Sequence, residues 1–429
     1  MCIRDRSDLG PRAASSSDRF STVAIRERRW RAEPVRKRSS SCSDVRLGVE
    51  ESPESMNRDR LSLARRWPTM SGMGAKTTTD FASFRKAAGQ LVDVRSPGEF
   101  AKGHWPGAVN LPLFNDEQRA EVGTTYKQQG RGQAIELGLA LVGPRLSAMA
   151  QRLRNLAGPS GSLRIYCWRG GMRSNSVARL AGLVDQTPLV LEGGYKAYRS
   201  WVLEQFRCDW PVKLLGGRTG SGKTDLLLAL AKRDVAVVDL EGLANHRGSS
   251  FGGLGLPEQP STEHYENCLA EALDRHRDTG AAEIWLEAES AQVGRCRIPR
   301  DLFVQMQGAD VLEVQRSADE RVEQLVAVYG HQGAAELSEA TQRISRRLGP
   351  QRTRQALDSI ASGDMRDACR AMLDYYDRCY NHELEQARDR RSVSIAGLAP
   401  EAAAEHLLAL GLVRSIHATV SPADTASGQ

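Results

Sequence analysis

The sequence predicts an α/β protein with two parallel-sheet domains, and three observations support this prediction. An apolar segment, 163–166, runs directly into Cys167 and a glycine-rich turn, and a helix is expected to begin near Ser174. A second apolar segment, 212–215, leads into another glycine-rich loop and then a helix. Strand and helix patterns alternate around both loops, which is the order that parallel sheets with crossover helices require.

The length and composition of the chain bound the class of protein. Its 429 residues allow two or three domains with a sizeable buried core. Hydrophobic residues make up 40% of the chain and charged residues 26%, and no apolar run approaches the roughly 18 residues that a membrane helix needs. A membrane protein and a single minimal binding module are therefore excluded.

The ends of the chain differ in composition from the rest. Residues 1–73 contain 16 basic and 10 acidic side chains, whereas the remainder carries equal numbers of each. They are rich in Arg and Ser with little hydrophobic periodicity, so we expect a disordered extension or a start codon assigned too far upstream. Residues 413–429 are expected to form a loose tail. Because the remainder is neutral, any RNA site there must be a local basic patch.

The cysteine pattern indicates free thiols. The eight cysteines include no C-x-x-C pair and no metal-ligand spacing with the eight histidines, so neither a zinc site nor a disulfide framework is expected. No tightly bound cofactor is indicated. The start of the chain lacks the apolar core of a signal peptide, which favours a cytoplasmic location and no membrane partner.

The first domain is expected over residues 80–205. Segment 91–95 predicts a buried strand, followed by turn residues and a helix that starts near Glu99. A helix is predicted over about 136–156, ahead of the strand that ends at the cysteine.

The second domain is expected over residues 211–412. The helix 225–231 follows its glycine-rich loop, and strands at 235–240 and 284–286 alternate with helices. The stretch 320–388 is rich in Arg, Glu and Ala and is predicted to be mainly helical.

Cys167 stands where a nucleophile can be activated. In a loop between a strand and a helix, backbone N–H groups and the helix N-terminus favour a thiolate and form an anion cradle. Two glycines allow tight curvature, and two arginines add positive charge. We predict that Cys167 is catalytic; the alternative is a buried, inert cysteine. The predicted anion-binding residues of the loop are Arg169, Gly170, Gly171, Arg173 and Ser174.

The cysteine loop resembles the active-site loop of rhodanese domains. Segments 93–95 (Asp-Val-Arg) and 104–108 (His-Trp-Pro-Gly-Ala) resemble that family's two N-terminal signatures. The resemblance implies a rhodanese-like fold and a cysteine that carries sulfur or selenium. The loop also satisfies C-x5-R, as in cysteine phosphatases, which would need a general acid. Neither Asp185 nor any other nearby carboxylate has a spacing that marks it for that role.

Residues 217–224 match the phosphate-binding pattern G-x-x-x-x-G-K-[ST] between a predicted strand and helix. Backbone N–H groups of such a loop wrap a diphosphate, which Lys223 would neutralise. Thr224 would ligate Mg²⁺ if a metal is bound. The motif does not specify which diphosphate is held. The predicted diphosphate-binding residues are Gly217, Gly220, Ser221, Gly222, Lys223 and Thr224.

Further candidate residues follow the next strands. Either Asp239 or Glu287 supplies the acid that often accompanies such a loop, or both are ordinary polar strand ends. Nucleotide hydrolysis is therefore not implied. Segment 245–250 is a polar loop after a strand, the position where α/β proteins bind ligands. His246 and Arg247 are its candidate ligand contacts, the alternative for a lone loop histidine being a solvated side chain.

A rhodanese-like loop joined to a phosphate-binding loop resembles the bacterial tRNA 2-selenouridine synthase family over roughly residues 80–400. This resemblance implies a rhodanese-like domain followed by a P-loop NTPase-like parallel-sheet domain with a helical C-terminal part. Further segments that resemble the family are 126–130 (Tyr-Lys-Gln-Gln-Gly), 192–197 (Glu-Gly-Gly-Tyr-Lys-Ala), 239–249 and 346–349 (Arg-Arg-Leu-Gly).

The resemblance implies a transferase that replaces sulfur by selenium in the wobble 2-thiouridine of tRNA. Selenophosphate is the implied selenium donor, and the enzyme that supplies it is an implied partner. The resemblance also implies an S-geranylated intermediate, made from geranyl diphosphate. From the site chemistry, we assign geranyl diphosphate to the phosphate loop and selenophosphate, or selenium carried on Cys167, to the cysteine loop. The alternatives are a rhodanese-type sulfurtransferase or C-x5-R phosphatase with a regulatory P-loop, and a non-catalytic nucleotide-gated RNA-binding protein.

A geranyl chain needs an apolar groove beside the phosphate loop. Four apolar side chains either line that groove or belong to the core: Phe251, Leu254, Leu256 and Trp285.

An RNA substrate needs basic and aromatic side chains. Arg343, Arg346 and Arg347 lie at helical spacing on one face, with Arg352 and Arg354 just beyond, so they either contact tRNA phosphates or form a salt-bridged surface. Four tyrosines either stack on an unpaired anticodon base or pack internally. These are Tyr195, Tyr375, Tyr376 and Tyr380.

Overall fold

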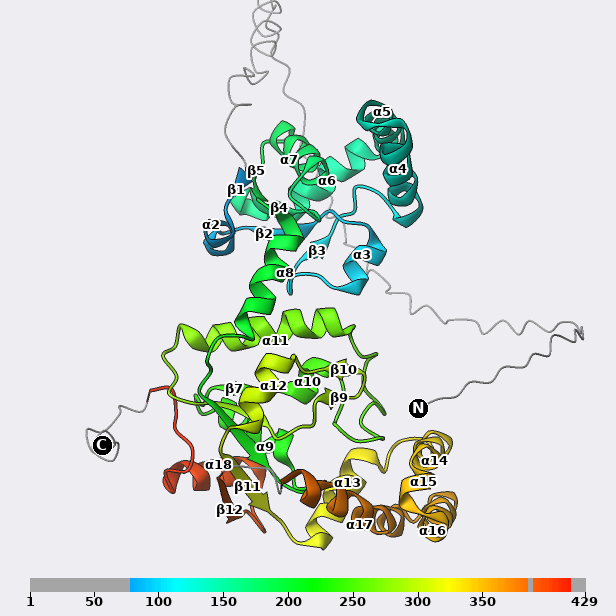
Figure 1. Ribbon diagram of the computed structural model, residues 1–429, viewed down its shortest axis with the longest axis vertical. Helices are drawn as coiled ribbons and strands as arrows, with labels where there is room; N and C mark the ends of the chain where they lie inside the picture. Colours follow the sequence, from blue (N-terminus) through cyan, green and yellow to red (C-terminus); the bar gives the residue numbers. More distant parts are fainter. Residues whose placement is uncertain (1–77, 385–388, 418–429) are drawn as a thin grey trace, which may run out of the picture. The chain divides into compact units, whose positions relative to one another are not determined.

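The computed structural model describes residues 78–384 and 389–417. In this part, the chain forms two α/β domains and a helical part (Figure 1). The expected extension 1–73 lies outside the described residues, and the expected tail is described only as far as residue 417.

The first domain contains one parallel sheet with the strand order β1-β5-β4-β2-β3. The non-sequential order follows from crossover helices between parallel strands. The elements are β1 (Thr78–Thr79), α2 (Phe81–Lys86), β2 (Gln90–Asp93), α3 (Pro97–Lys102), β3 (Val109–Asn110), α4 (Asp116–Gln129), α5 (Arg131–Val142), the 3-10 turn η2 (Gly143–Arg145), α6 (Leu146–Ala157), the 3-10 turn η3 (Gly158–Ser160), β4 (Ser162–Tyr166), α7 (Met172–Leu183), β5 (Thr187–Leu191) and α8 (Gly194–Gln205).

Helices cover both faces of this sheet. In β2, Leu91 packs in a cluster with Phe84 of α2, whereas the next residue, Val92, packs in a separate cluster with Val177 of α7. Successive side chains of a strand point to opposite faces, so the two clusters are the two sides of the sheet. Burial on both faces explains why the central strands read as continuous apolar runs.

The helix predicted over 136–156 is instead two helices, α5 and α6, separated by the turn η2. Pro144 lies in this turn; it has no N–H to donate and it restricts the residue before it, so the helix ends here.

The second domain also contains a five-stranded parallel sheet, with the order β12-β11-β6-β8-β7, and a separate antiparallel pair, β9 and β10. Its elements are β6 (Val212–Gly216), α9 (Lys223–Ala231), β7 (Val237–Val238), α10 (Leu240–Ala244), α11 (Thr262–Arg277), β8 (Ile284–Glu287), β9 (Gln292–Val293), β10 (Cys296–Arg297), α12 (Arg300–Gln307), β11 (Val311–Gln315), β12 (Arg390–Ser394) and α18 (Pro400–Ala409).

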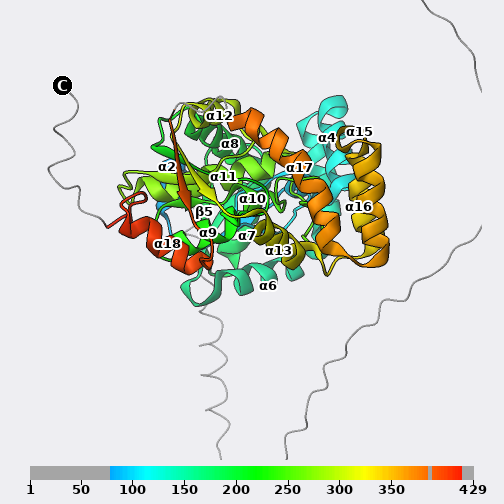
Figure 2. The same cartoon turned by 90° about the horizontal axis from the view of Figure 1, so that it is seen from below.

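In the sequence, the helical part lies between β11 and β12 (Figure 1). Helix α16 packs against both α14 and α17, and Figure 2 shows α16 beside α17. The mainly helical character predicted for 320–388 is confirmed as far as residue 384. Its helices are α13 (Ala318–Tyr329), α14 (Ala334–Arg343), α15 (Ser345–Leu348), α16 (Pro350–Ser362) and α17 (Met365–Leu384).

One predicted strand of the second domain is shorter than expected. The strand predicted over 235–240 covers only β7, because Asp239 is already the N-cap of α10 and accepts a hydrogen bond from Gly242 N at 2.6 Å.

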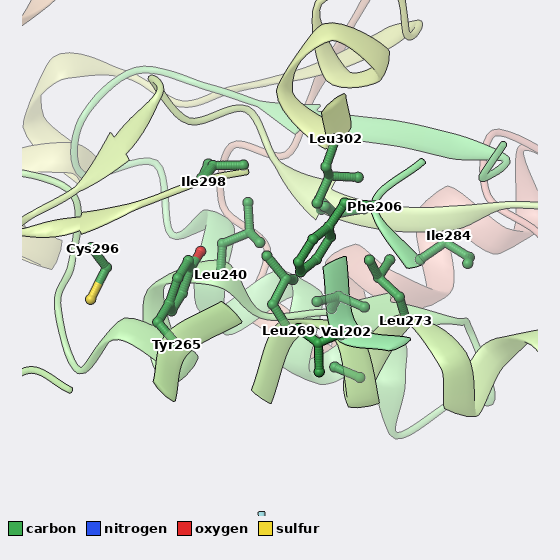
Figure 3. Close-up of a cluster of buried hydrophobic side chains, with 14 of the residues drawn as sticks. Val202, Phe206, Leu240, Tyr265, Leu269, Leu273, Ile284, Cys296, Ile298 and Leu302 are labelled. Carbon is green, nitrogen blue, oxygen red and sulfur yellow. The ribbon is translucent and has the colours of Figure 1, made fainter. Parts of the chain in front are cut away.

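The two domains share a hydrophobic core. Val202 and Phe206, at the end of α8, belong to the same buried cluster as Leu269 and Leu273 of α11 and Ile284 of β8 (Figure 3). All five side chains are at most 1% exposed. The last helix of the first domain is therefore also a structural part of the second.

Ion pairs surround this shared core. Arg85 of α2 lies 3.1 Å from Glu271 and 2.6 Å from Asp274, both on α11. Arg199 of α8 lies 2.5 Å from Glu266. These pairs join side chains that are less than a third exposed, and they fix α11 beside the first domain.

Candidate functional sites

Cys167 lies at the end of β4, in the loop that leads into α7, and only 3% of it is exposed. Its Sγ lies 3.2 Å from the hydroxyl oxygen of Ser174, a fully buried residue in the first turn of α7. The Ser174 hydroxyl also donates to Gly171 O at 3.1 Å. The structure thus places a sulfur nucleophile beside the N-terminus of a helix, where anions bind.

The start of α8 holds the cysteine loop from the other side. Tyr195 N donates to Cys167 O at 2.8 Å, and Lys196 N donates to Trp168 O at 3.0 Å. Gly194 makes this close approach possible: a Cβ built there would lie 2.3 Å from Cys167 O and 2.5 Å from Gly170 N. Its φ of +57° is also a conformation that favours glycine.

The two loop arginines have different surroundings. Arg173 Nη1 donates to Glu99 Oε2 at 2.7 Å, whereas Arg169 is exposed and forms no ion pair with any residue that the structure describes. Burial alone would raise the pKa of the Glu99 carboxyl, but the hydrogen bond and charge of Arg173 hold that pKa below its ordinary value. Arg169 is therefore the freer cation for an incoming anion.

A buried ion pair lies next to the cysteine loop. Arg95 Nη2 lies 2.7 Å from Asp93 Oδ2, and both side chains are at most 1% exposed. The Arg95 guanidinium lies 3.7 Å from the centre of the Tyr195 ring and 6.0 Å from that of Trp168. Desolvation alone would lower the Arg95 pKa, but Asp93 raises it above its ordinary value, so the guanidinium stays charged and the Asp93 carboxylate balances its charge.

The second site is formed by residues 217–224, between β6 and α9. Lys223 Nζ donates to Gly217 O at 2.9 Å, within the loop. Gly220 and Gly222 have φ values of +82° and +75°, so the loop takes the left-handed turns that its glycines allow. The predicted diphosphate residues are thus brought together around one turn at the N-terminus of a helix.

An acidic group lies beside this loop. Thr224 Oγ1 donates to Glu241 Oε2 at 2.6 Å. Burial raises the pKa of Glu241 above its ordinary value, although Lys223 and the Thr224 hydrogen bond oppose that shift. Glu287 is fully buried and accepts from Leu240 N at 2.9 Å. Desolvation, together with Asp239 and Glu241, raises the pKa of Glu287 well above its ordinary value.

A pocket of about 310 Å³ opens on the phosphate loop. Beyond the loop itself, Arg247, Glu289 and Tyr329 are among its lining residues. A smaller cavity of about 40 Å³ adjoins it, and its walls are almost entirely apolar. This apolar cavity is lined by Thr219, Ser249, Phe251, Leu325, Tyr329, Gly330, Leu337, Ile360, Met365, Ala368, Cys369, Met372, Leu373 and Tyr376.

The pocket and the apolar cavity share five lining residues, so the two hollows are neighbours. The shared residues are Thr219, Ser249, Leu325, Tyr329 and Tyr376.

Only one of the other three predicted ligand contacts lines the phosphate-loop pocket. Arg247 lines the phosphate-loop pocket, but His246 and Asp239 do not. Asp239 instead caps α10, and the His246 ring lies under the turn at Gly252, where a Cβ would be 2.8 Å from its Cε1. Of the apolar candidates, Phe251 lines the apolar cavity, whereas Trp285 is 3% exposed and belongs to the core.

The predicted basic patch is exposed but partly neutralised. Arg343 lies 3.3 Å from Glu339, and Arg352 lies 2.9 Å from Asp374. Arg346 and Arg347 are exposed in the short helix α15. Among the residues that the structure describes, His, Cys, Asp and Glu form no group of three or more arranged to hold a metal ion.

Several pocket residues had no motif to reveal them. The pocket is completed by Glu241 of α10, by Glu289 just after β8, and by Gln324 and Tyr329 of α13. It is also lined by Tyr376 of α17. The only local signal was the position of Glu241 and Glu289 just after strands, where parallel sheets place their ligand-binding residues.

The fold and the two sites define a class: a protein with a rhodanese-like domain and a P-loop domain. A model of the rhodanese-like domain matches residues 77–200, and a model described as the tRNA 2-selenouridine synthase AAA domain matches residues 210–404. Within the described residues, no helix is long and apolar enough to cross a membrane.

Curated relatives match both domains. The chain is 36% identical over 350 residues to the tRNA 2-selenouridine synthase of Shewanella denitrificans, a match that covers 73% of this chain and 93% of the relative. The synthase of Marinobacter nauticus is 38% identical over 334 residues, covering 69% and 88%. That of Sulfurovum sp. is 35% identical over 349 residues, covering 73% and 93%. The chain belongs to the tRNA 2-selenouridine synthase family.

Proposed function

We propose that this protein is a tRNA 2-selenouridine synthase, which replaces sulfur by selenium at the wobble 2-thiouridine of tRNA. Family membership supports the overall reaction. Family membership also favours this function over the sulfurtransferase, phosphatase and RNA-binding alternatives, because no observation supports any of these three separately.

The first half-reaction is assigned to the phosphate loop. The 2-thiouridine sulfur attacks C1 of geranyl diphosphate, a C–S bond forms, and the C–O bond to diphosphate breaks. Lys223 and the loop N–H groups would bind the leaving diphosphate and stabilise its charge. The product is an S-geranyl nucleoside, whose thioether sulfur can later depart.

The neighbouring apolar cavity is the observation that supports this assignment. A nucleotide would place a polar ribose beside the diphosphate, whereas this cavity is lined by aliphatic, methionine and aromatic side chains. Such a lining suits a hydrocarbon chain, because burial of apolar surface drives its binding, and the cavity of about 40 Å³ would widen as the chain enters. The pocket next to it supplies the charged end of the site.

The second half-reaction is assigned to the cysteine loop. The selenium of bound selenophosphate attacks C2 of the base, a C–Se bond forms, and the C–S bond breaks so that the geranylated sulfur leaves as the thiol. Arg169 is the exposed cation that would receive the selenophosphate anion, and the buried Arg95, paired with Asp93, packs against the Tyr195 and Trp168 rings beside the loop. Hydrolysis of the P–Se bond then releases phosphate.

Thr224 and Glu241 present two oxygens beside the phosphate loop, and they are hydrogen-bonded to each other. This donor set falls short of the six oxygen ligands that Mg²⁺ prefers without water and substrate oxygens, so no step is routed through a metal.

Nucleoside mass spectrometry tests the proposal. Substrate tRNA containing 2-thiouridine is incubated with the full chain, geranyl diphosphate and selenophosphate, and each donor is omitted in turn. We expect S-geranyl-2-thiouridine without selenophosphate and 2-selenouridine with both donors. The Lys223→Ala variant should lose geranylation, and Cys167→Ala should lose only the selenium step. Unchanged tRNA with active donors would refute the function, and geranylation undiminished in Lys223→Ala would refute the role of the loop.

A further inference from the structure

The hairpin formed by α4 and α5 contributes few residues to the core of its domain. All 14 residues of α4 lie outside the buried set, although a helix in a globular domain ordinarily buries one apolar face. In α5 the buried residues are small or lie at its end: Ala134, Gly138 and Val142. Val142, with Val122 and Leu141 packed against its cluster, joins the hairpin to the core, and most of the remaining hairpin surface faces solvent.

The tip of the hairpin, residues 126–133, has the composition of an RNA-binding segment. It contains Lys127 and Arg131, three glutamines and Tyr126, and no acidic residue occurs from 122 to 135. The Tyr126 side chain is 51% exposed, and both cations are exposed. Charged and amide side chains of this kind contact phosphate and sugar oxygens.

The two cations at the tip are free of carboxylates. Neither Lys127 nor Arg131 forms an ion pair with any residue that the structure describes, in contrast to Arg343 and Arg352 of the helical part, which pair with Glu339 and Asp374. A cation without a carboxylate partner can neutralise a phosphate without first breaking an ion pair, so it favours RNA binding more than a paired cation does.

The base of the hairpin is attached next to the cysteine loop. Glu99 accepts from Arg173, in the first turn of α7, at 2.7 Å, and from Arg119 of α4 at 3.4 Å. Gly98 N also donates to Asp116 Oδ1, at the start of α4, at 3.0 Å. A 14-residue helix is about 21 Å long, so the tip lies about that far from the end of α4 that is attached beside the cysteine loop.

We propose that the hairpin tip, residues 126–133, binds the phosphate backbone of the tRNA substrate, at the stem that adjoins the base undergoing exchange. This inference rests on the proposed function, because it takes tRNA as the substrate. One end of α4 lies at the cysteine loop, and the other end carries the cations that hold the stem.

The test is tRNA binding by the full chain, measured by fluorescence anisotropy over a range of salt concentrations. The variant is Lys127→Ala/Arg131→Ala. Its matched control is Lys86→Ala/Arg154→Ala, which removes two exposed cations that form no ion pair among the described residues and lie on α2 and α6. Both double variants change only exposed side chains and lower the net charge equally.

We expect the tip variant to bind tRNA about 15- to 30-fold more weakly at about 0.15 M salt, because each lost phosphate contact removes a slope of about 0.7–0.9 in log Kd against log salt. The salt slope should fall by about 1.4–1.8. The control should stay within about twofold of the unchanged chain. Equal affinity and slope in the tip variant and the control would overturn the inference.

A second RNA separates this inference from the proposed function. A single-stranded oligonucleotide that contains 2-thiouridine but has no stem should bind the tip variant and the unchanged chain equally well. A loss of affinity for this oligonucleotide as well would overturn the assignment to the stem. If the unchanged chain binds no tRNA and converts none, the proposed function itself fails; if it converts tRNA and the tip variant binds normally, only the hairpin inference fails.

Discussion

Gly194 offers a sharp test of how the cysteine loop is held, because it lies outside the loop, at the start of α8. In a Gly194→Ala variant, the new Cβ would lie 2.3 Å from Cys167 O, 2.5 Å from Gly170 N and 2.9 Å from Arg169 N. All three atoms belong to the backbone, so no side chain can rotate away. The residue would also keep a φ of +57°, which disfavours alanine.

The expected cost follows from these two effects. A left-handed alanine costs about 1–2 kcal/mol, and overpacking a tight site adds about 1–3 kcal/mol. The sum of about 2–5 kcal/mol would appear as lower stability, or as a displaced loop if the backbone yields. A shift of about 1 Å at Cys167 would lower the rate of selenium transfer by about 100-fold.

Two assays measure this prediction. Urea unfolding, followed by tryptophan fluorescence, reports stability, and nucleoside mass spectrometry reports the selenium step and geranylation separately. The control is Gly182→Ala in α7, where an added Cβ would meet no atom within 4 Å. Geranylation should persist in Gly194→Ala, because the phosphate loop is untouched. A variant that matches the Gly182→Ala control in both stability and selenium transfer would refute this account of the loop.

Three further predictions concern the phosphate-loop domain. Lys223→Ala should weaken the binding of inorganic diphosphate by roughly 10- to 150-fold, measured by calorimetry, because a charged hydrogen bond contributes about 1.5–3 kcal/mol; unchanged affinity would contradict the role of Lys223. Ala368→Leu should fill the apolar cavity and weaken geranyl diphosphate much more than inorganic diphosphate, and an equal effect on both would show that the chain lies elsewhere. Glu287 has a raised pKa in the folded chain, so the folded state binds more protons than the unfolded state above about pH 4.5, and stability falls as pH rises. The stability of Glu287→Gln relative to the unchanged chain should therefore increase between about pH 5 and pH 8 in urea unfolding, and a constant or decreasing difference would contradict the raised pKa.

The sequence predicts the parts of the structure that depend on neighbours in the chain. The strand, the loop and the helix around Cys167 follow one another without interruption, as do those around Lys223, so both loops could be placed from local patterns alone. Pro144 was also a local signal for the break between α5 and α6, but the apolar pattern on either side favoured a continuous helix.

The residues that complete the pockets depend on the tertiary fold. Tyr376 reaches the phosphate loop from α17, more than 150 positions further along the chain, and no spacing rule connects the two. Two polar elements could not be recognised from the sequence. Strand β12 has the sequence Arg-Arg-Ser-Val-Ser, without the apolar run that marks a buried strand, and helix α4 has no apolar stripe. Their structures follow from pairing with β11 and with α5.

Helix α8 limits how this protein can be divided. Its first turn holds the cysteine loop through Tyr195 and Lys196, and Val202 and Phe206 near its other end are buried against α11. A fragment that stopped short of α11 would expose the apolar end of α8 to water and would be prone to aggregate. A chimera assembled from two relatives would need α8 and α11 from the same parent, so the two domains must be inherited, and engineered, as a matched pair.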